Sequence, residues 1–510
     1  MPKSPQPTEL SALFEKVLEH VRETALLEST TAVLEWDEHT GLPDQAAEYR
    51  SQQLMLLSGL VHHRRTDPKL GEWLRELAAE IESHTMRAGD IDPMATCVRC
   101  MLRDYDRNIR LPESLVKQIA RATSLGQQMW VKAKRDSDFA SFAPFLEEIV
   151  RLRRKEAKLL TDGDRPIYDA LLDQYEEGAK SEEVSVIFSE LRDALVPLIQ
   201  AGADRRDSQP AFQDANYDIA AQRGFSRWVA EKIGFDFQRG RLDETEHPFC
   251  TTLGPHDHRI LTRYHADSFS SGLLGVLHEA GHGMYEQGLP VEWYGTPMAT
   301  AASLGVHESQ SRLWENLVGL SHSFWEWCWP IAEERFPQLR TVSLERAVRD
   351  LNRVRRSLIR IEADEVTYNL HILIRFELEI ELMNDRLAIS DLPQAWNDKY
   401  EAYLGIRPAN DAEGVLQDVH WPAGLIGYFP TYTLGNIYAS QLFEAADREL
   451  DGVHAKIARG EFSPLLEWLR SRIHRFGRSV PPMALIERAT GSRVTSAPLI
   501  RHLTRKVASS

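Results

Sequence analysis

The sequence predicts a mainly α-helical protein with a small β-sheet near the middle of the chain. Apolar residues recur at spacings of three and four from Leu10 to Val21, which is the stripe of an amphipathic helix. Similar patterns occupy residues 114–123, 145–160 and 182–199. Residues 345–385 contain neither Pro nor Gly and predict one long helix. Segments of extended character are rare, so helices dominate the expected fold.

The clearest strand signal lies at residues 259–265, where β-branched and aromatic residues follow a turn-rich Gly-Pro-His-Asp sequence. Residues 247–253 just before that turn are the expected hairpin partner. No Gly/Ser linker divides the chain. We therefore expect residues 1–510 to form a single unit; the alternative is two lobes, between which the sequence defines no boundary.

Composition excludes several classes of function. The 510 residues carry a formal net charge of −16, which argues against nucleic-acid binding, because that needs a basic surface. No apolar run is long enough to span a membrane. The N-terminal sequence MPKSPQPTEL has no apolar core, which predicts no signal peptide. Four cysteines in so long a chain are no disulfide framework, so we expect the cytoplasm.

The segment from His278 to His282 reads His-Glu-Ala-Gly-His, an HExxH sequence. Residues four apart lie on one face of a helix, so both imidazoles can reach one metal ion. Glu279 lies beside that ion and can take a proton from a bound water. Ser270 or Ser271 is the expected N-cap of the helix. The alternative reading of the pentapeptide alone is a helix with two surface histidines.

A catalytic zinc ion needs a third protein ligand and one open position for water. Glu308, in the sequence His-Glu-Ser-Gln, follows on a second segment of helical pattern, and a loop rich in Gly and Pro at residues 287–297 makes the turn between the two. Glu308 can therefore fold back onto the same ion. Two histidines and a glutamate are a ligand set that zinc enzymes use to hydrolyse peptide bonds.

Further motifs extend the pattern over most of the chain. They are His247-Pro248-Phe249, the IRxxAD-like stretch at residues 359–364, the GxxQDxHW-like stretch at residues 414–421, the sequence GYFPTY at residues 427–432, and Trp36-Asp37 with Thr40 and Pro43. Together with HExxH and HESQ they stand in the order found in one family. The sequence resembles the carboxypeptidase Taq-type, or thermostable, metallocarboxypeptidases.

The resemblance implies a large helical body around a deep groove, with a gluzincin-like HExxH site beside a small sheet. It implies one divalent ion per chain, zinc or else cobalt, held by His278, His282 and Glu308, with Glu279 as general base. The implied activity is release of C-terminal amino acids, with broad specificity, from peptides that have a free C-terminus. The family also implies a homodimer.

Four more side chains are candidates for the site. The family motifs put His420 and Tyr428 near the metal, where either can donate to the oxyanion of the tetrahedral intermediate; the alternative for both is a packing role. Arg259 and Arg360 are candidates to bind the substrate carboxylate, because a guanidinium pairs with carboxylates in bidentate fashion. The alternative is that Asp257 or Asp364 holds these arginines in structural salt bridges.

One position departs from the family pattern. The family motif DxRxT reads here as Asp-His-Arg-Ile-Leu, with Leu261 where Thr is expected and Thr262 next to it. A shift of one residue in a strand points the hydroxyl to the other face. Two alternatives stand beside the carboxypeptidase. A metallo-oligopeptidase that cleaves internal bonds would use the same HExxH chemistry, and Leu261 leaves open a catalytically weakened peptide-binding homologue. The intact Glu279 argues against the latter.

Overall fold

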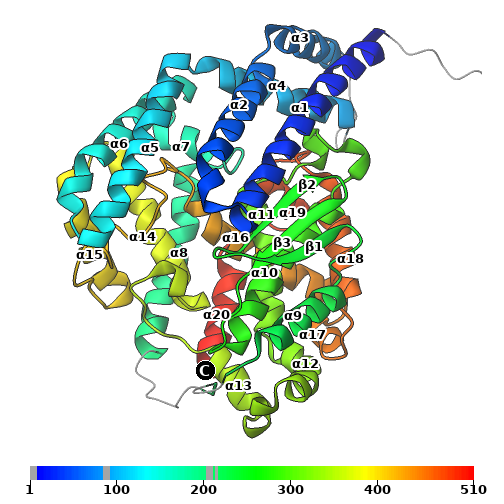
Figure 1. Cartoon of the computed structure of the whole chain (residues 1–510), viewed down its shortest axis with the longest axis vertical. Coiled ribbons are helices and arrows are strands. Elements are labelled where there is room, and N and C mark those ends of the chain that lie inside the picture. The colour runs from blue at the N-terminus through cyan, green and yellow to red at the C-terminus, as the bar shows by residue number, and fades with distance from the viewer. Residues whose placement is uncertain (1–8, 84–91, 203–210, 213–215, 510) are drawn as a thin grey trace, which may run out of the picture. The chain divides into compact units, whose positions relative to one another are not determined.

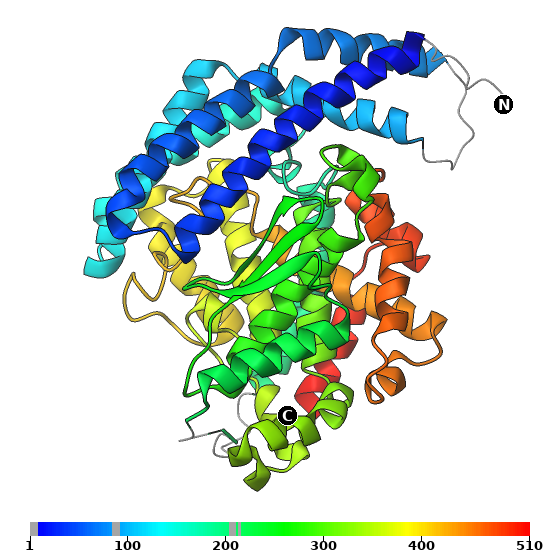
Figure 2. The same cartoon turned by 45° about the vertical axis from the view of Figure 1, so that its right-hand side comes forward.

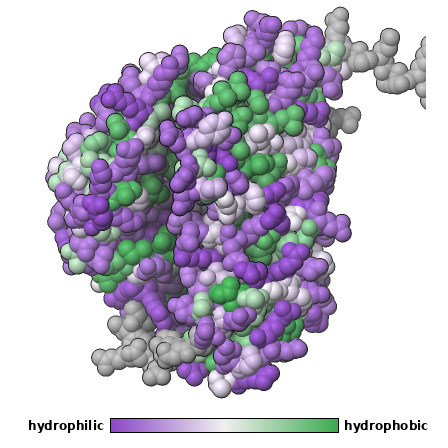
Figure 3. Space-filling view, viewed as in Figure 1, coloured by the Kyte–Doolittle hydropathy of each residue, from purple (hydrophilic) through white to green (hydrophobic). Residues whose placement is uncertain are grey.

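The computed structural model describes residues 9–83, 92–202, 211–212 and 216–509. Residues 1–8, on which part of the signal-peptide prediction rests, lie outside these ranges. The described chain is mainly helical with one small three-stranded sheet, which confirms the predicted fold class. None of its helices, within these ranges, is long and apolar enough to cross a membrane. Hydrophilic residues predominate on the face shown in Figure 3, with smaller hydrophobic areas among them.

Contacts within the chain define two compact units, each assembled from three separate stretches of sequence. The first comprises Met1–Arg110, Asn216–Ala302 and Glu461–Pro481, and the second comprises Leu111–Ala215, Ser303–Gly460 and Pro482–Ser510. Because the stretches of the two units alternate along the chain, no single linker separates them, and none is visible in the sequence.

The first unit combines helices with the sheet (Figures 1 and 2). Its helices are α1 (Glu9–Thr40), α2 (Ala47–Arg65), α3 (Pro68–Ser83), α4 (Pro93–Arg110), α9 (Ile219–Ile233), α10 (Phe269–Gly288) and α18 (Ser463–Arg472). An apolar cluster joins α1 to α3, and it includes Phe14 and Val17 of α1 and Leu74 and Leu77 of α3. These α1 residues belong to the apolar stripe predicted at the start of the chain.

The sheet has the strand order β1 (Gly240–Glu244), β3 (Asp257–Thr262), β2 (Phe249–Gly254). β2 and β3 form the predicted antiparallel hairpin, whereas β1, which was not predicted, pairs with β3 in parallel. The predicted strand ran on to residue 265, but the described strand ends at Thr262. α10 packs against β3 and β2, and α1 contacts β2. The sheet is thus the support on which the HExxH helix lies.

The second unit contains helices and loops but no strand among its described residues. The helices are α5 (Glu113–Asp136), α6 (Phe139–Leu160), α7 (Ile167–Leu172), α8 (Ser181–Gly202), α11 (Leu304–Arg312), α12 (His322–Arg335), α13 (Leu344–Leu351), α14 (Glu365–Met383), α15 (Leu392–Leu404), α16 (Pro430–Glu449), α17 (Val453–Ile457), α19 (Pro482–Thr490) and α20 (Ala497–Ser509). The periodic segments predicted at 114–123, 145–160 and 182–199 fall within α5, α6 and α8. α16 is buried along most of its length and packs against α11.

The prediction of one helix over residues 345–385 is wrong. α13 ends at Leu351, and α14 begins at Glu365. Between them, the Asn352 amide donates to the carbonyls of Leu320 and Val348, and the Asp364 carboxylate accepts the Val366 and Thr367 N–H groups as the N-cap of α14. Polar side chains that compete with the backbone end a helix without Pro or Gly.

Candidate metal centre

Helix α10 carries the HExxH sequence. Its N-cap is Ser268, whose hydroxyl accepts the Ser271 N–H at 3.3 Å, and not Ser270 or Ser271 as predicted, because the chain turns into the helix two residues earlier. The rings of His278 and His282 lie with centroids 5.0 Å apart, as expected for residues one helical turn apart. Glu279 between them is buried. The surface-histidine alternative therefore does not describe this helix.

Thr262 at the end of β3 hydrogen bonds to α10. Its hydroxyl donates to the Gly272 carbonyl at 3.2 Å, and a Cβ on Gly275 would lie only 2.7 Å from Thr262 Oγ1. The neighbouring Leu261 is fully buried and pairs with Phe249 of β2. The departure from the family motif thus puts an apolar side chain at 261, while the hydroxyl at 262 supports the HExxH helix.

Glu308 lies on the short helix α11, whose N-cap is Ser303. Its carboxylate accepts hydrogen bonds from Arg312 Nε at 2.7 Å and from Ser311 Oγ at 3.0 Å. On α16, Gly435 lies so close that a Cβ there would stand 2.7 Å from the Glu308 Cγ. The Glu308 carboxylate is therefore tightly restrained within its own unit.

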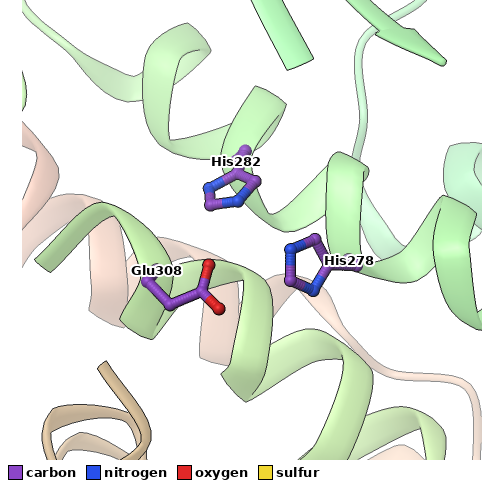
Figure 4. A group of neighbouring side chains, drawn as sticks. All are labelled: His278, His282 and Glu308. Carbon is purple, nitrogen blue, oxygen red and sulfur yellow. The ribbon is translucent and has the colours of Figure 1, made fainter. Parts of the chain in front are cut away.

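The three predicted ligand residues lie together. His278, His282 and Glu308 each offer one ligand atom, and these atoms lie within 4.8 Å of one another (Figure 4). Two imidazole nitrogens and one carboxylate oxygen are the donors that zinc takes in hydrolytic enzymes, with one position left for water. The chemistry of this donor set fits a divalent ion.

Arg312 was missed by the sequence analysis, although it bonds directly to Glu308. Its guanidinium also donates to Glu315 at 3.1 Å and lies 4.7 Å from the centre of the Tyr368 ring. The Glu315 side chain is half-buried against Arg312. Arg312 thus connects the carboxylates of Glu308 and Glu315.

The rings of His420 and Tyr428 lie with centroids 5.5 Å apart, and a third side chain, Tyr432, contacts both. The Tyr432 hydroxyl lies 3.1 Å from His420 Nε2 and hydrogen bonds to Tyr428. Burial lowers the pKa of His420 to about 4, so its ring is neutral at neutral pH. Burial, and then the charge of Glu308, raise the pKa of Tyr428. Only the GYFPTY motif pointed toward Tyr432.

Arg360 is buried and pairs with Asp418, not with Asp364 as the structural alternative supposed. Its Nε donates to Asp418 at 2.9 Å, and Arg375 donates to the other carboxylate oxygen at 2.6 Å. Burial alone would raise the pKa of Asp418, but the charges of Arg375 and Arg360 outweigh it and hold that pKa well below its usual range. Two guanidinium groups share one carboxylate, so this cluster of three side chains keeps one positive charge in excess.

Arg259 makes the structural pair that was the alternative to substrate binding. Its Nε and Nη2 donate to the two oxygens of Asp257 at 3.0 and 2.9 Å. Its guanidinium also lies 4.1 Å from the centre of the Trp36 ring, a residue of the N-terminal motif. The structure thus connects two of the motifs, and a role of Arg259 toward substrate stays a prediction.

Comparison with known proteins places this chain in the class of metallopeptidases. Residues 16–507 match the family model described as Carboxypeptidase Taq (M32) metallopeptidase, and the chain belongs to that family. It is 44% identical over 507 residues to thermostable carboxypeptidase 1 of Thermus thermophilus, with 98% of both chains covered. It is 36% identical to carboxypeptidase 1 of Bacillus subtilis, with 93% of this chain and 94% of the relative covered.

Solved structures extend the likeness to the fold. The M32 carboxypeptidase from Deinococcus radiodurans R1 superposes with a TM-score of 0.93 at 40% identity, covering 98% of this chain and 99% of that one. The Pyrococcus furiosus carboxypeptidase superposes with a TM-score of 0.92 at 34% identity, covering 99% and 100%. The protein is thus a metal-dependent carboxypeptidase, a hydrolase of peptide bonds, and internal cleavage is not favoured.

Proposed function

We propose that this carboxypeptidase holds one divalent ion through His278, His282 and Glu308 and releases amino acids from free peptide C-termini with broad specificity. The observation that carries the proposal is the convergence of the three ligand atoms within 4.8 Å, with the buried Glu279 next to His278 on the same helix. A bound ion would polarise the scissile carbonyl as a Lewis acid.

We assign the proton transfers of the reaction to side chains of this protein. Glu279 takes a proton from the attacking water and passes it to the leaving amine, which is the role of a general base that then acts as an acid. The negative oxygen that develops on the carbonyl carbon needs hydrogen-bond donors. Tyr428 can donate because burial keeps its hydroxyl protonated, and His420 can donate from its neutral ring.

The Arg360 cluster supports recognition of the substrate C-terminus. Arg360, Arg375 and Asp418 together leave one positive charge in excess, and a peptide carboxylate would neutralise it. Arg259 is the weaker candidate, because Asp257 balances its charge in a pair, whereas Asp418 is shared by two arginines. Such a site selects a free carboxylate without selecting the side chain before it, which suits broad specificity.

The proposal also covers the native metal ion, the cellular location, the oligomeric state and the ligands of the protein. We take the native ion to be zinc, with cobalt able to replace it, because the donor set suits zinc. A cytoplasmic location is supported by four free cysteines. A homodimer is supported by the family resemblance and by exposed apolar side chains on α2, such as Tyr49, Met55 and Leu56. The proposed ligands are peptides, not nucleic acids or membranes.

One experiment tests the activity and its direction together. A peptide with a free C-terminus and its C-terminally amidated form are incubated with the native protein, the chelated protein and the chelated protein resupplied with zinc. We expect release of amino acids from the free form, loss on chelation and recovery with zinc. Equal cleavage of the amidated peptide, or activity that survives complete metal removal, would contradict the proposal.

A further inference from the structure

Glu176 is a fully buried carboxylate outside the proposed catalytic group. It follows α7 and accepts three hydrogen bonds: from the Tyr438 hydroxyl at 2.8 Å, from the Gly305 N–H at 3.1 Å, and from the Ser303 hydroxyl. Burial raises the pKa of this carboxyl to about 7. Taking a carboxylate out of water is costly, so a group kept there needs a compensating role.

That role concerns the start of α11. The first N–H groups of a helix have no partner inside the helix. Here the Leu304 N–H donates to the Tyr175 carbonyl at 3.1 Å, Gly305 donates to Glu176, and Val306 donates to Ser303 Oγ at 3.0 Å. The turn at Tyr175 and Glu176 thus binds two consecutive N–H groups and fixes where α11 begins.

α16 fixes the other side of α11. Gly435 and Tyr438 lie one helical turn apart on α16: Gly435 contacts Glu308, and Tyr438 donates to Glu176. A Cβ at Gly305 would stand 2.7 Å from Glu176 Oε2, so the backbone at Gly305 is also packed directly against Glu176. Glu308 follows Gly305 by one helical turn. Any shift of the start of α11 would therefore be passed on to the Glu308 carboxylate.

We propose that Glu176 is a positioning residue that fixes α11 so that Glu308 is held ready to bind the metal. The inference rests on the proposed role of Glu308 as a metal ligand. Partners of metal ligands outside the coordination shell set the orientation of those ligands, and their loss weakens metal affinity. Glu176 acts one step further out, through the helix itself, and it does not touch substrate or metal.

Glu379 provides a matched control, because it is a buried glutamate with a similar set of donors. It accepts from the Tyr168 hydroxyl at 2.7 Å, from Trp421 Nε1 at 2.9 Å and from the Gly427 N–H at 3.0 Å. Its pKa is likewise raised by burial to about 7. These donors belong to the segment of His420 and Tyr428 and to α7, not to α11.

The test removes one hydroxyl from each set. Zinc affinity is measured for the wild type, Tyr438→Phe, Glu176→Gln and Tyr168→Phe by competition with a chromophoric chelator, together with melting temperature and kcat at saturating zinc. We expect Tyr438→Phe and Glu176→Gln to weaken zinc binding about tenfold. Tyr168→Phe makes the same chemical change at an equally buried tyrosine and should leave zinc affinity within about twofold of wild type.

Each other outcome has a distinct meaning. If Tyr438→Phe lowers the melting temperature but binds zinc as tightly as wild type, Glu176 only stabilises the fold and the inference is wrong. The same holds if Tyr168→Phe weakens zinc binding equally. Tyr438→Phe decides the matter even if Glu176→Gln does not fold. A wild type that binds no zinc would instead overturn the proposed metal site, and this inference with it.

Discussion

Gly435 of α16 and Glu308 of α11 are packed so closely that no other residue fits at position 435 without a shift. An added Cβ would stand 2.7 Å from Glu308 Cγ and 2.8 Å from its Cβ, which are atoms near the backbone and cannot swing aside. The absence of a side chain at 435 is therefore a requirement of the proposed metal site.

Gly435→Ala should push Glu308 away from its place and weaken zinc binding by about tenfold or more. Melting temperature should fall as well, because the added methyl group overpacks a buried contact. Gly59→Ala is the matched control: Gly59 lies on α2 with no atom within 4 Å of the added Cβ, so stability should be unchanged or higher. Unchanged zinc affinity in Gly435→Ala would contradict the expected coupling.

Glu279→Gln should abolish most of the activity and retain the metal. The amide preserves the size of the buried side chain but cannot accept the proton of the attacking water. Loss of a general base costs about 10²–10⁴-fold in rate. We expect kcat to fall by that factor, with zinc stoichiometry and melting temperature close to wild type. A variant that hydrolyses peptides as fast as wild type would remove Glu279 from the mechanism.

The sequence predicted the parts of the site that are set by local spacing. His278 and His282 share a face because they are four residues apart on one helix, and that spacing is visible without a structure. Glu308 could be placed because its motif follows at a distance that a loop can close. The small sheet was half predicted: the hairpin is local, whereas the parallel pairing of β1 with β3 joins strands that are not adjacent in sequence.

The residues that support the site could not be predicted in this way. Glu176 acts through Tyr438 and Gly305, which are far from it in sequence and meet it only by packing. Arg312 pairs with Glu308 at a spacing of four residues, but many surface helices carry such a pair, so the spacing alone did not single it out. The break after Leu351 was missed for a related reason. Asn352 stops the helix by bonding to Leu320, and no Pro or Gly marks the place.

Glu379 should make stability depend on pH in a direction opposite to that of most acidic groups. Burial raises its pKa from 4.5 to about 7, so the folded state keeps a proton that the unfolded state loses between these values. The contribution of Glu379 to the unfolding free energy is complete below pH 4.5 and is lost as the pH rises through 7. Compared with Glu379→Gln, the wild type should therefore lose roughly 2.5 kcal/mol of unfolding free energy between pH 5 and pH 8.

Urea unfolding at the two pH values measures that difference. Glu444→Gln is the control, because the hydrogen bond from Arg501 holds the pKa of Glu444 below its usual value. Arginine keeps its charge at both pH values, so this substitution should cost nearly the same free energy at pH 5 and at pH 8. A gap for Glu379→Gln that is constant or grows with pH would contradict the protonated state of Glu379.

Arg360 and Arg259 can be separated by their response to conservative replacement. A lysine keeps the charge but loses the planar fork that pairs with a carboxylate. Hydrogen bonds to charged groups contribute about 1.5–3 kcal/mol, so Arg360→Lys should lower kcat/KM for peptides with a free C-terminus by roughly 10–150-fold. Arg259→Lys should have a much smaller effect, because Asp257 already balances the charge of Arg259. Melting temperature is measured in parallel, since Arg360 also pairs with Asp418. If Arg259→Lys impairs hydrolysis more than Arg360→Lys at equal stability, the two arginines exchange roles.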